Sequence, residues 1–229
     1  MTDIIVLSYN DTLFIDKCLM SIKDTCSDYN LIIINNNRTN LGFSAGVNKG
    51  LKMSKAPYVW LLNSDAIVTE GAQNALLQLL NNQPKAGMVS GMQIHPGNNN
   101  IITYGGSGPY WPNGVHIGGF VSRLDCNTAC KQEWLNFTSV MIKREVIEKV
   151  GLLDENMFLL YSDSDYSLRV KEAGFELWYE PHSKVIHTLN YSYSKVNSNE
   201  ELKEKDKETF RLKWIKTLDQ QTEVHPQSK

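Results

Sequence analysis

The sequence predicts an α/β fold in which a Rossmann-like, mostly parallel sheet is flanked by helices. Short apolar runs rich in β-branched residues alternate with longer segments whose apolar residues recur at helical spacing. The links between these segments are short, which favours parallel strands joined by helices. The length of 229 residues suits one sizeable core or two tightly joined lobes.

The N-terminal part of the chain supplies most of this alternation. Its short, β-branched or apolar runs predict buried strands at 4–9, 31–34, 59–62 and 88–91. The segments between them predict helices at 11–25, 43–53 and 71–82. In the first of these segments the apolar side chains fall at helical spacing, at Phe14, Ile15, Leu19 and Ile22.

The composition changes after Gln93. Residues 95–119 are rich in Gly, Asn, Pro and aromatics, which is typical of a binding loop. Beyond it the pattern predicts strands at 134–142, 175–179 and 184–187, and helices at 144–150 and 162–173. Gly174 then follows as a C-terminal helix cap.

These changes divide the chain into three parts. Residues 1–93 form one half of a single domain, and residues 94–198 form its other half. Residues 199–229 form an amphipathic helix and tail, with apolar members at Leu202, Phe210, Trp214, Ile215 and Leu218. This helix either packs on its own domain, which we favour, or makes a peripheral membrane or homodimer contact.

Bulk properties exclude some classes of function. A net charge of −2 gives no basic face for nucleic acid. No apolar run approaches the length of a membrane span, and the N-terminus lacks the positive region of a signal peptide. The four cysteines therefore predict reduced thiols in a cytoplasmic protein. Cys126 and Cys130 lack a second pair with zinc-site spacing.

A single carboxylate marks the end of the third predicted strand. The run from Tyr58 to Leu62 leads into Asn63-Ser64-Asp65 before apolar residues resume. Open α/β sheets bind ligands at the carboxyl ends of their strands, which places Asp65 at the edge of a cleft. The alternative is an ordinary Asn-Ser-Asp turn.

Three further segments carry candidate chemistry. Small residues in 40–50 let backbone approach a ligand closely at a helix N-terminus, although this glycine pattern alone is weak. Asp163 opens the helix at 162–173 as a candidate general base, and Asp165 and Arg169 lie one turn apart and can pair. The alternative there is acidic charge complementing the helix dipole. His187 ends the last predicted strand.

Together these motifs resemble family 2 glycosyltransferases of the GT-A fold, most closely the rhamnosyltransferase-like branch that builds bacterial surface polysaccharides. The resemblance covers roughly residues 3–190 and depends on the order and spacing of several motifs. They are Ser8-Tyr9-Asn10, Asn40-x-Gly42-Phe43-x-x-Gly46-x-Asn48-x-Gly50, Leu62-Asn63-Ser64-Asp65, Asp163-x-Asp165-x-x-x-Arg169, Pro181 and His187.

The resemblance implies an inverting transfer from a nucleotide-sugar (UDP-, dTDP- or GDP-linked) to a hydroxyl of a glycan or lipid-linked acceptor. Residues 1–93 would then be the nucleotide-sugar-binding half of the domain, and residues 94–198 the acceptor-binding and catalytic half. Asp163 would be the catalytic base, and Asp65 and His187 would hold Mn²⁺ or Mg²⁺. The implied nucleotide-sugar residues are Ser8, Tyr9, Asn10, Asn35, Asn40, Gly42, Phe43, Gly46, Asn48, Asn63 and Ser64. The loop aromatics Tyr104, Tyr110 and Trp111 could stack on acceptor sugar rings.

Two residues depart from the family pattern. Asn35 stands where an acidic residue usually contacts the base, and Ser162 stands where Glu commonly precedes the catalytic Asp. These departures motivate an alternative: a nucleotide-sugar or glycan-binding module of the same fold with weak or lost turnover.

Overall fold

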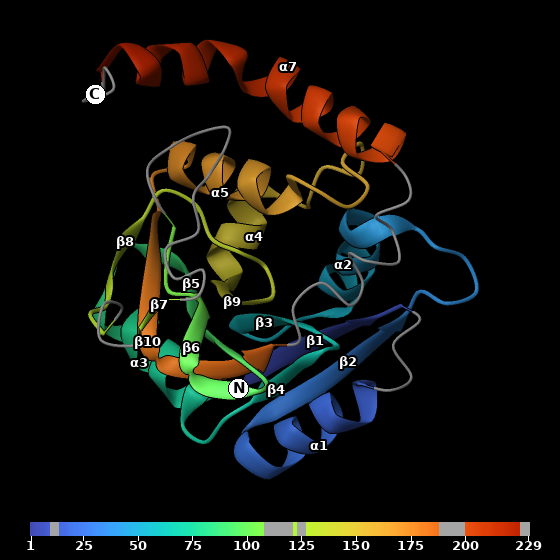
Figure 1. Ribbon diagram of the computed structural model, residues 1–229, viewed down its shortest axis with the longest axis vertical. Helices are drawn as coiled ribbons and strands as arrows, with labels where there is room; N and C mark the ends of the chain where they lie inside the picture. The colour runs from blue at the N-terminus through green and yellow to red at the C-terminus, as the bar shows by residue number, and fades with distance from the viewer. Residues whose placement is uncertain (10–13, 108–120, 123–126, 188–199, 225–229) are drawn as a thin grey trace.

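The computed structural model describes residues 1–9, 14–107, 121–122, 127–187 and 200–224 (Figure 1). Its strands are β1 (Thr2–Ser8), β2 (Tyr29–Asn35), β3 (Tyr58–Asn63), β4 (Ala66–Val68), β5 (Ala86–His95), β6 (Asn98–Tyr104), β7 (Val121–Ser122), β8 (Cys130–Gln132), β9 (Ser139–Lys143) and β10 (Glu176–His187). Its helices are α1 (Ile15–Thr25), α2 (Gly42–Met53), α3 (Ala72–Asn82), α4 (Arg144–Val150), α5 (Ser162–Glu172) and α7 (Glu200–Val224).

All ten strands belong to one sheet, with the central order β2-β1-β3-β9-β5-β10-β4. β1 pairs in parallel with β2 and β3, as the alternation of strand and helix predicted. β9 then inserts between β3 and β5 and runs antiparallel to both. The sheet is therefore parallel in its N-terminal part and mixed where the second half of the chain joins it.

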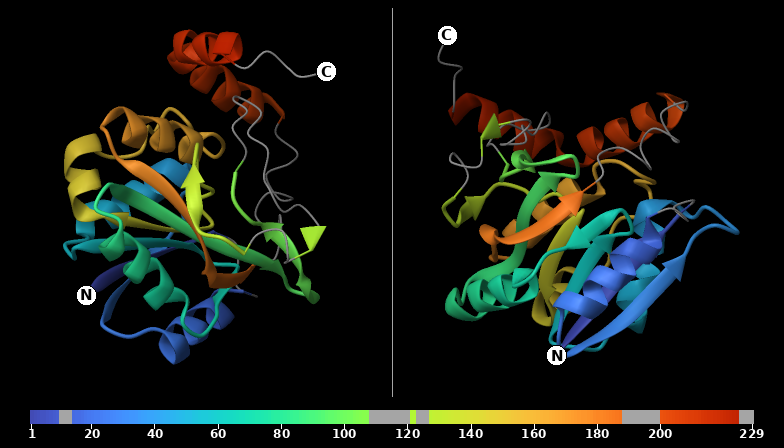
Figure 2. Two further views of the ribbon diagram at one scale, coloured as in Figure 1. Left: turned by 90° about the vertical axis from the view of Figure 1, so that its left-hand side faces the viewer. Right: turned by 60° about the horizontal axis from the view of Figure 1, so that its bottom comes forward.

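The sheet is covered by helices on both faces (Figures 1 and 2). Side chains of β1 alternate between the faces, since Ile5 packs with the apolar residues of α2, α4 and α5, whereas Ile4 and Val6 pack with those of α1 and α3. Trp60 of β3 is fully buried on the α1 and α3 face. This two-sided burial explains why β1 and β3 read as nearly continuous apolar runs. β2 lies at the end of the strand order and exposes Leu31 and Ile33, which corrects our expectation of a buried strand there.

Several elements differ from the sequence-based expectation. β6 lies within the segment that we expected to be a loop, and the strands expected at 175–179 and 184–187 are one strand, β10. The strand expected at 134–142 begins only at Ser139, as β9, and β4 and β8 were not expected. The pairing of β10 with β5 shifts register between Glu180 and Lys184, around Pro181. Proline cannot donate to the sheet ladder, which explains why the sequence appeared to contain two strands.

Helix α7 lies over α5 and the segment that leads into it (Figure 1). Its Phe210 and Trp214 are buried against Met157 and Leu168. The favoured expectation, packing on its own domain, therefore holds for these two residues. In the described part of the chain, no helix combines the length and apolar character needed to cross a bilayer.

Candidate active site

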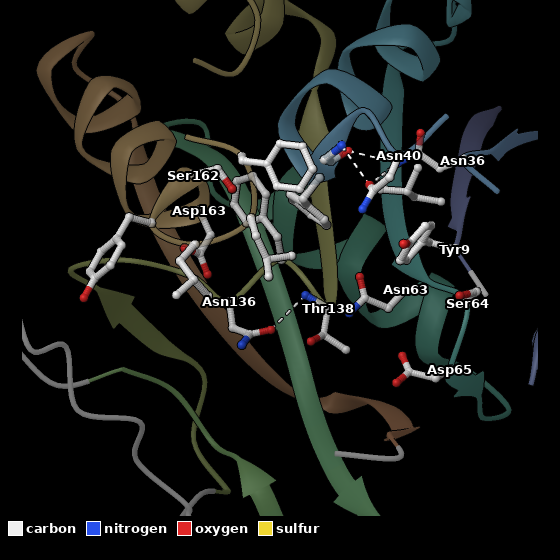
Figure 3. Close-up of a pocket in the computed structure, with 18 of the residues that line it drawn as sticks. Tyr9, Asn36, Asn40, Asn63, Ser64, Asp65, Asn136, Thr138, Ser162 and Asp163 are labelled. Carbon is white, nitrogen blue, oxygen red and sulfur yellow. Dashed lines mark hydrogen bonds between the residues drawn. The ribbon is translucent and has the colours of Figure 1, made fainter. Parts of the chain in front are cut away.

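A pocket of about 290 Å³ opens at the carboxyl ends of β1 and β3 and extends to the start of α5 (Figure 3). It collects residues from both halves of the chain. Its lining consists of Leu7, Tyr9, Asn36, Asn40, Gly42, Phe43, Asn63, Ser64, Asp65, Asn136, Phe137, Thr138, Phe158, Leu159, Leu160, Tyr161, Ser162, Asp163 and His187. The edge of the sheet predicted to bind a ligand is thus the edge that is hollowed.

Asp65 and His187 meet at one end of this pocket. They are brought together by the sheet, because Ala66 at the start of β4 pairs with His187 at the end of β10. His187 Nε2 lies 3.3 Å from Asp65 Oδ1, and both side chains are mostly buried. His187 Nδ1 is buried and has no hydrogen-bond partner among the residues that the structure describes.

This pair fits part of a divalent-metal shell. A carboxylate oxygen and an imidazole nitrogen suit Mn²⁺ or Mg²⁺, and neighbouring ligands of an octahedral ion with bonds of about 2.1 Å lie about 3 Å apart. Among the described residues, no group of three or more His, Cys, Asp or Glu side chains could hold a metal. Asp65 and His187 would therefore hold the ion together with ligands from outside the chain.

Asp163 lies at the opposite side of the pocket, in the first turn of α5 (Figure 3). Burial raises the pKa of its carboxyl group to about 6, against the opposing effect of backbone hydrogen bonds from Ser164 and Phe137. The Ser164 N–H donates to Asp163 Oδ1 at 2.8 Å. The carboxylate is thus more basic than an ordinary Asp and reaches the pocket.

The predicted pair of Asp165 and Arg169 is present one helical turn further on. Arg169 Nε donates to Asp165 Oδ2 at 3.0 Å, and Asp165 is fully buried. The other oxygen of Asp165 accepts a hydrogen bond from Trp214 Nε1 and contacts Lys213 Nζ. Asp165 is therefore engaged by α5 and α7 and does not line the pocket, which leaves Asp163 as the carboxylate of α5 that does.

The loop before α2 approaches the pocket only through its first part. Asn40, Gly42 and Phe43 line the pocket. Gly42 has a φ of +83°, and a Cβ there would lie 2.5 Å from the Phe158 carbonyl oxygen, which accepts a hydrogen bond from Phe43 N at 2.6 Å. Here glycine permits a close backbone contact between two walls of the pocket.

Gly46 and Asn48 serve the packing of α2 and not the pocket, which corrects our expectation for them. A Cβ on Gly46 would lie 2.6 Å from Leu7 Cδ1, so glycine lets α2 approach β1 closely. Asn48 is buried and exchanges hydrogen bonds with the backbone of Leu153 in both directions. Its amide also donates to Glu155, which leaves no role toward a ligand.

Asn35, expected to contact the nucleotide base, is exposed at the end of β2 and does not line the pocket, whereas the next residue, Asn36, does. Asn36 accepts a hydrogen bond from Leu41 N and donates to the Gly42 carbonyl oxygen, so it shapes the loop. Tyr9 lines the pocket, and Ser8 is buried beside it without lining it.

Tyr104 does not face an acceptor, contrary to our expectation. Its side chain is 1% exposed and packs edge-on against Tyr179, and its hydroxyl contacts Ser90 and Ser107. The other two aromatics expected to bind acceptor, Tyr110 and Trp111, lie outside the described residues, as does Asn10.

Sequence reasoning missed several wall residues of the pocket. Asn136 and Thr138 precede β9 and are joined by a hydrogen bond from Thr138 N to Asn136 Oδ1 (Figure 3). Phe158 to Tyr161 form another wall. The Asn-Phe-Thr triplet at 136–138 was included in the strand expected at 134–142, although its polar residues could have indicated the first wall. The second wall has no distinctive residue pattern.

Comparison with known proteins identifies the family. A model described as "Glycosyltransferase like family 2" matches residues 1–215. The chain belongs to this family. The matched range contains the strand-end carboxylate Asp65, the helix carrying Asp163 and most of the described part of α7, so the pocket lies wholly within the family domain.

A curated relative points to the same branch that the motifs resemble. The N-acetylglucosaminyl-diphospho-decaprenol L-rhamnosyltransferase of Mycobacterium tuberculosis is 25% identical, in an alignment covering 67% of this chain and 57% of that protein. The chain thus spans somewhat more than half the length of this relative.

Solved structures confirm the predicted GT-A fold. GalNAc-T7, solved with UDP, GalNAc and Mn²⁺, superposes with a TM-score of 0.65 at 13% identity, covering 82% of this chain and 43% of that one. The mannosyltransferase PcManGT of Pyrobaculum calidifontis, solved with GDP-Man and Mn²⁺, gives a TM-score of 0.57 at 14% identity and covers 84% of this chain and 58% of that one. At such identities the likeness concerns the fold.

Proposed function

We propose that this protein is an inverting, divalent-metal-dependent glycosyltransferase that moves a sugar from a nucleotide-sugar to an acceptor hydroxyl. One observation carries the proposal: a single pocket places Asp163, a carboxylate with a pKa of about 6, across from the Asp65–His187 pair. Inverting transfer needs a base on one face of the sugar and charge stabilisation of the leaving group on the other.

Asp163 is suited to the proton transfer. A carboxyl group with a pKa of about 6 is mostly ionised at pH 7, yet it accepts a proton more readily than an ordinary Asp. The acceptor hydroxyl attacks the anomeric carbon as the bond to the diphosphate breaks, and Asp163 takes the hydroxyl proton. A divalent metal, when bound, neutralises the negative charge that grows on the leaving diphosphate.

The remaining wall residues would hold the donor. Asn40, Gly42 and Phe43 form one side, and Asn63 and Ser64 follow β3 into the Asp65 corner. The amide and hydroxyl groups of these residues can bind phosphate and sugar oxygens without adding charge. Within the Asn63-Ser64-Asp65 triplet, Asp65 is the one acidic residue, and Asn63 and Ser64 are neutral.

The relative suggests a substrate class. Its name describes rhamnosyl transfer to a lipid-linked acceptor. For this protein we propose a deoxyhexosyl or hexosyl donor and a glycan or lipid-linked acceptor. The reaction would serve surface polysaccharide synthesis at the cytoplasmic face of a membrane.

Flotation with anionic liposomes tests membrane contact. Binding that is weakened by Leu212→Ser, at an exposed leucine of α7, would support it, and absence of binding would remove it.

A thermal-shift screen of UDP-, dTDP- and GDP-linked sugars, each with and without Mn²⁺, tests the proposal. A ligand that binds only the folded state raises the unfolding temperature by mass action. We expect one nucleotide class to stabilise the protein only with metal, followed by sugar transfer or donor hydrolysis. Stabilisation without turnover would favour the binding-module alternative, and a flat response to every donor would count against both.

A further inference from the structure

A buried carboxylate of α7 binds the backbone of the pocket wall that leads to Asp163. Asp206 has no exposed surface. Its Oδ1 accepts the N–H of Phe158, and its Oδ2 accepts those of Leu159 and Leu160, each at 2.8 Å. A buried carboxylate is tolerated only when its oxygens accept hydrogen bonds. The three consecutive backbone amides meet this need, so Asp206 and the segment 158–160 hold each other in place.

The segment so bound, residues 157–163, is here called the base loop. Its other edge is attached to α2, since Met157 O accepts a hydrogen bond from Ser44 Oγ at 2.5 Å and Phe158 O accepts one from Phe43 N at 2.6 Å. Residues 158–163 line the pocket. Residues 157–160 of the base loop, which precede α5, are thus fixed between α2 and α7.

Further residues on the same helix contact the chain on either side of Asp163. Phe210, one turn after Asp206, stacks on Tyr161 with ring centroids 5.2 Å apart. Tyr161 has a φ of +63°, an unusual value for a non-glycine residue, so its conformation depends on the surrounding contacts. One turn later, Trp214 Nε1 donates to Asp165 at 2.9 Å.

We propose that Asp206 is a positioning residue, which places Asp163 against the acceptor by fixing the backbone of the base loop. The inference depends on the proposed function, because it assigns Asp206 a part in the transfer step. Asp206 does not line the pocket and contacts neither Asp65 nor His187. Its loss should therefore affect the chemical step more than donor binding.

The test compares Asp206→Asn with wild type and with Glu208→Gln, which neutralises an exposed carboxylate on the same helix. Asparagine keeps one acceptor oxygen and replaces the other by an NH₂ group that cannot accept an amide hydrogen bond. Because a misplacement of about 1 Å can cost about 100-fold in rate, we expect kcat to fall about 10- to 100-fold. Donor KM should stay within about threefold, and Glu208→Gln should match wild type.

Rates are to be measured well below the unfolding midpoint of each variant, so that loss of folded protein does not enter kcat. If Asp206→Asn does not fold, Asp206→Glu decides, since it keeps the carboxylate but displaces it by one methylene from the three amides and should give the same separation of kcat from KM. An unchanged kcat, or equal losses in kcat and donor affinity, would overturn the positioning role. Absence of metal-dependent donor binding by the wild type would instead overturn the proposed function.

Discussion

The two sides of the pocket are held in place by different means. The donor side, Asn63 to Asp65 with His187, follows directly from strand ends, because β3, β4 and β10 belong to the sheet. The base loop contains no strand and is fixed by side chains from distant helices: Ser44 of α2 and Asp206 of α7. The donor side is therefore determined by the sheet, and the base loop by contacts made after the sheet and helices pack.

This difference has a functional consequence. A metal and a diphosphate need ligands that stay fixed, which sheet ends provide. A proton-accepting group must match whatever acceptor the enzyme uses, and a loop supported from outside the sheet can be altered without changing the donor site.

Replacement of Asp163 should have the largest effect. Asp163→Asn removes the base while keeping the side-chain size, so transfer should fall by about 100- to 10,000-fold. Nucleotide-sugar binding with Mn²⁺ should persist. Glu172→Gln, at an exposed carboxylate on the same helix, is the matched control. Transfer at the wild-type rate by Asp163→Asn would show that another group takes the proton.

The donor side should respond in the opposite way. Asp65→Asn removes the carboxylate of the proposed metal pair, and we expect metal-dependent donor binding to weaken on the order of 100-fold. Titration calorimetry with Mn²⁺ and the stabilising nucleotide measures this. Glu70→Gln, an exposed carboxylate just beyond β4, should leave affinity unchanged. Retention of full metal-dependent affinity in Asp65→Asn would exclude Asp65 as a ligand.

The pH profile separates the two sides further. Burial raises the pKa of Asp163 to about 6, so the proposed base becomes increasingly protonated, and unable to accept a proton, as the pH falls below that value. The limiting rate should fall about tenfold per pH unit below pH 6. Donor affinity measured over the same range shows whether the donor side titrates. A rate that stays flat down to pH 5 would contradict the assignment.

The same raised pKa has an effect on stability whose sign follows from proton linkage. Between about pH 4 and 6 the folded protein binds the Asp163 proton more tightly than the unfolded chain, so this contribution to stability is lost as pH rises through about 6. At pH 7, Asp163→Asn should therefore raise the unfolding free energy by about 1–3 kcal/mol. Urea titrations at pH 4.5 and pH 7 compare the variant with wild type.

Contacts from α7 should contribute to stability as well. Trp214→Phe removes a hydrogen bond to the buried Asp165, and we expect the unfolding free energy to fall by about 1–3 kcal/mol. Leu212→Ala, at an exposed leucine of the same helix, should change it by no more than about 0.5 kcal/mol. If the two variants unfold alike, α7 does not stabilise α5 through this bond.

The place of Asn63, Ser64 and Asp65 at a strand end and in the pocket could be predicted because the information is local. A strand followed by this triplet indicates both an element and its ligand-binding end, whereas the roles of these residues toward a donor stay predictions. The helix carrying Asp163 was evident from residues 162–173. The family resemblance placed His187, and the structure gives the reason: its pairing partner Ala66 follows Asp65.

The base loop and the glycines could not be interpreted in the same way. No residue pattern in Phe158 to Tyr161 reports that Asp206, 46 to 48 positions away, binds the amides of the first three residues. Asn48 and Gly46 have the residue types of a phosphate loop but pack against Leu153 and Leu7. Tyr104 was expected on a loop, yet β6 carries it into the interior. In each case the position of the residue depends on a packing partner that is distant in the sequence, so the local sequence does not indicate it.

Gly50→Ala tests this interpretation of α2 and should have the smallest effect. A Cβ there would lie 2.5 Å from Cγ2 of Ile5, a buried β-branched residue of β1. Alanine gains up to about 1 kcal/mol of helix propensity, but overpacking costs about 1–3 kcal/mol, so we expect a net loss of about 1 kcal/mol with donor affinity unchanged. In an Ile5→Ala background the penalty should disappear, because the contacting methyl group is gone. A loss of nucleotide affinity without a loss of stability would instead return these glycines to the ligand site.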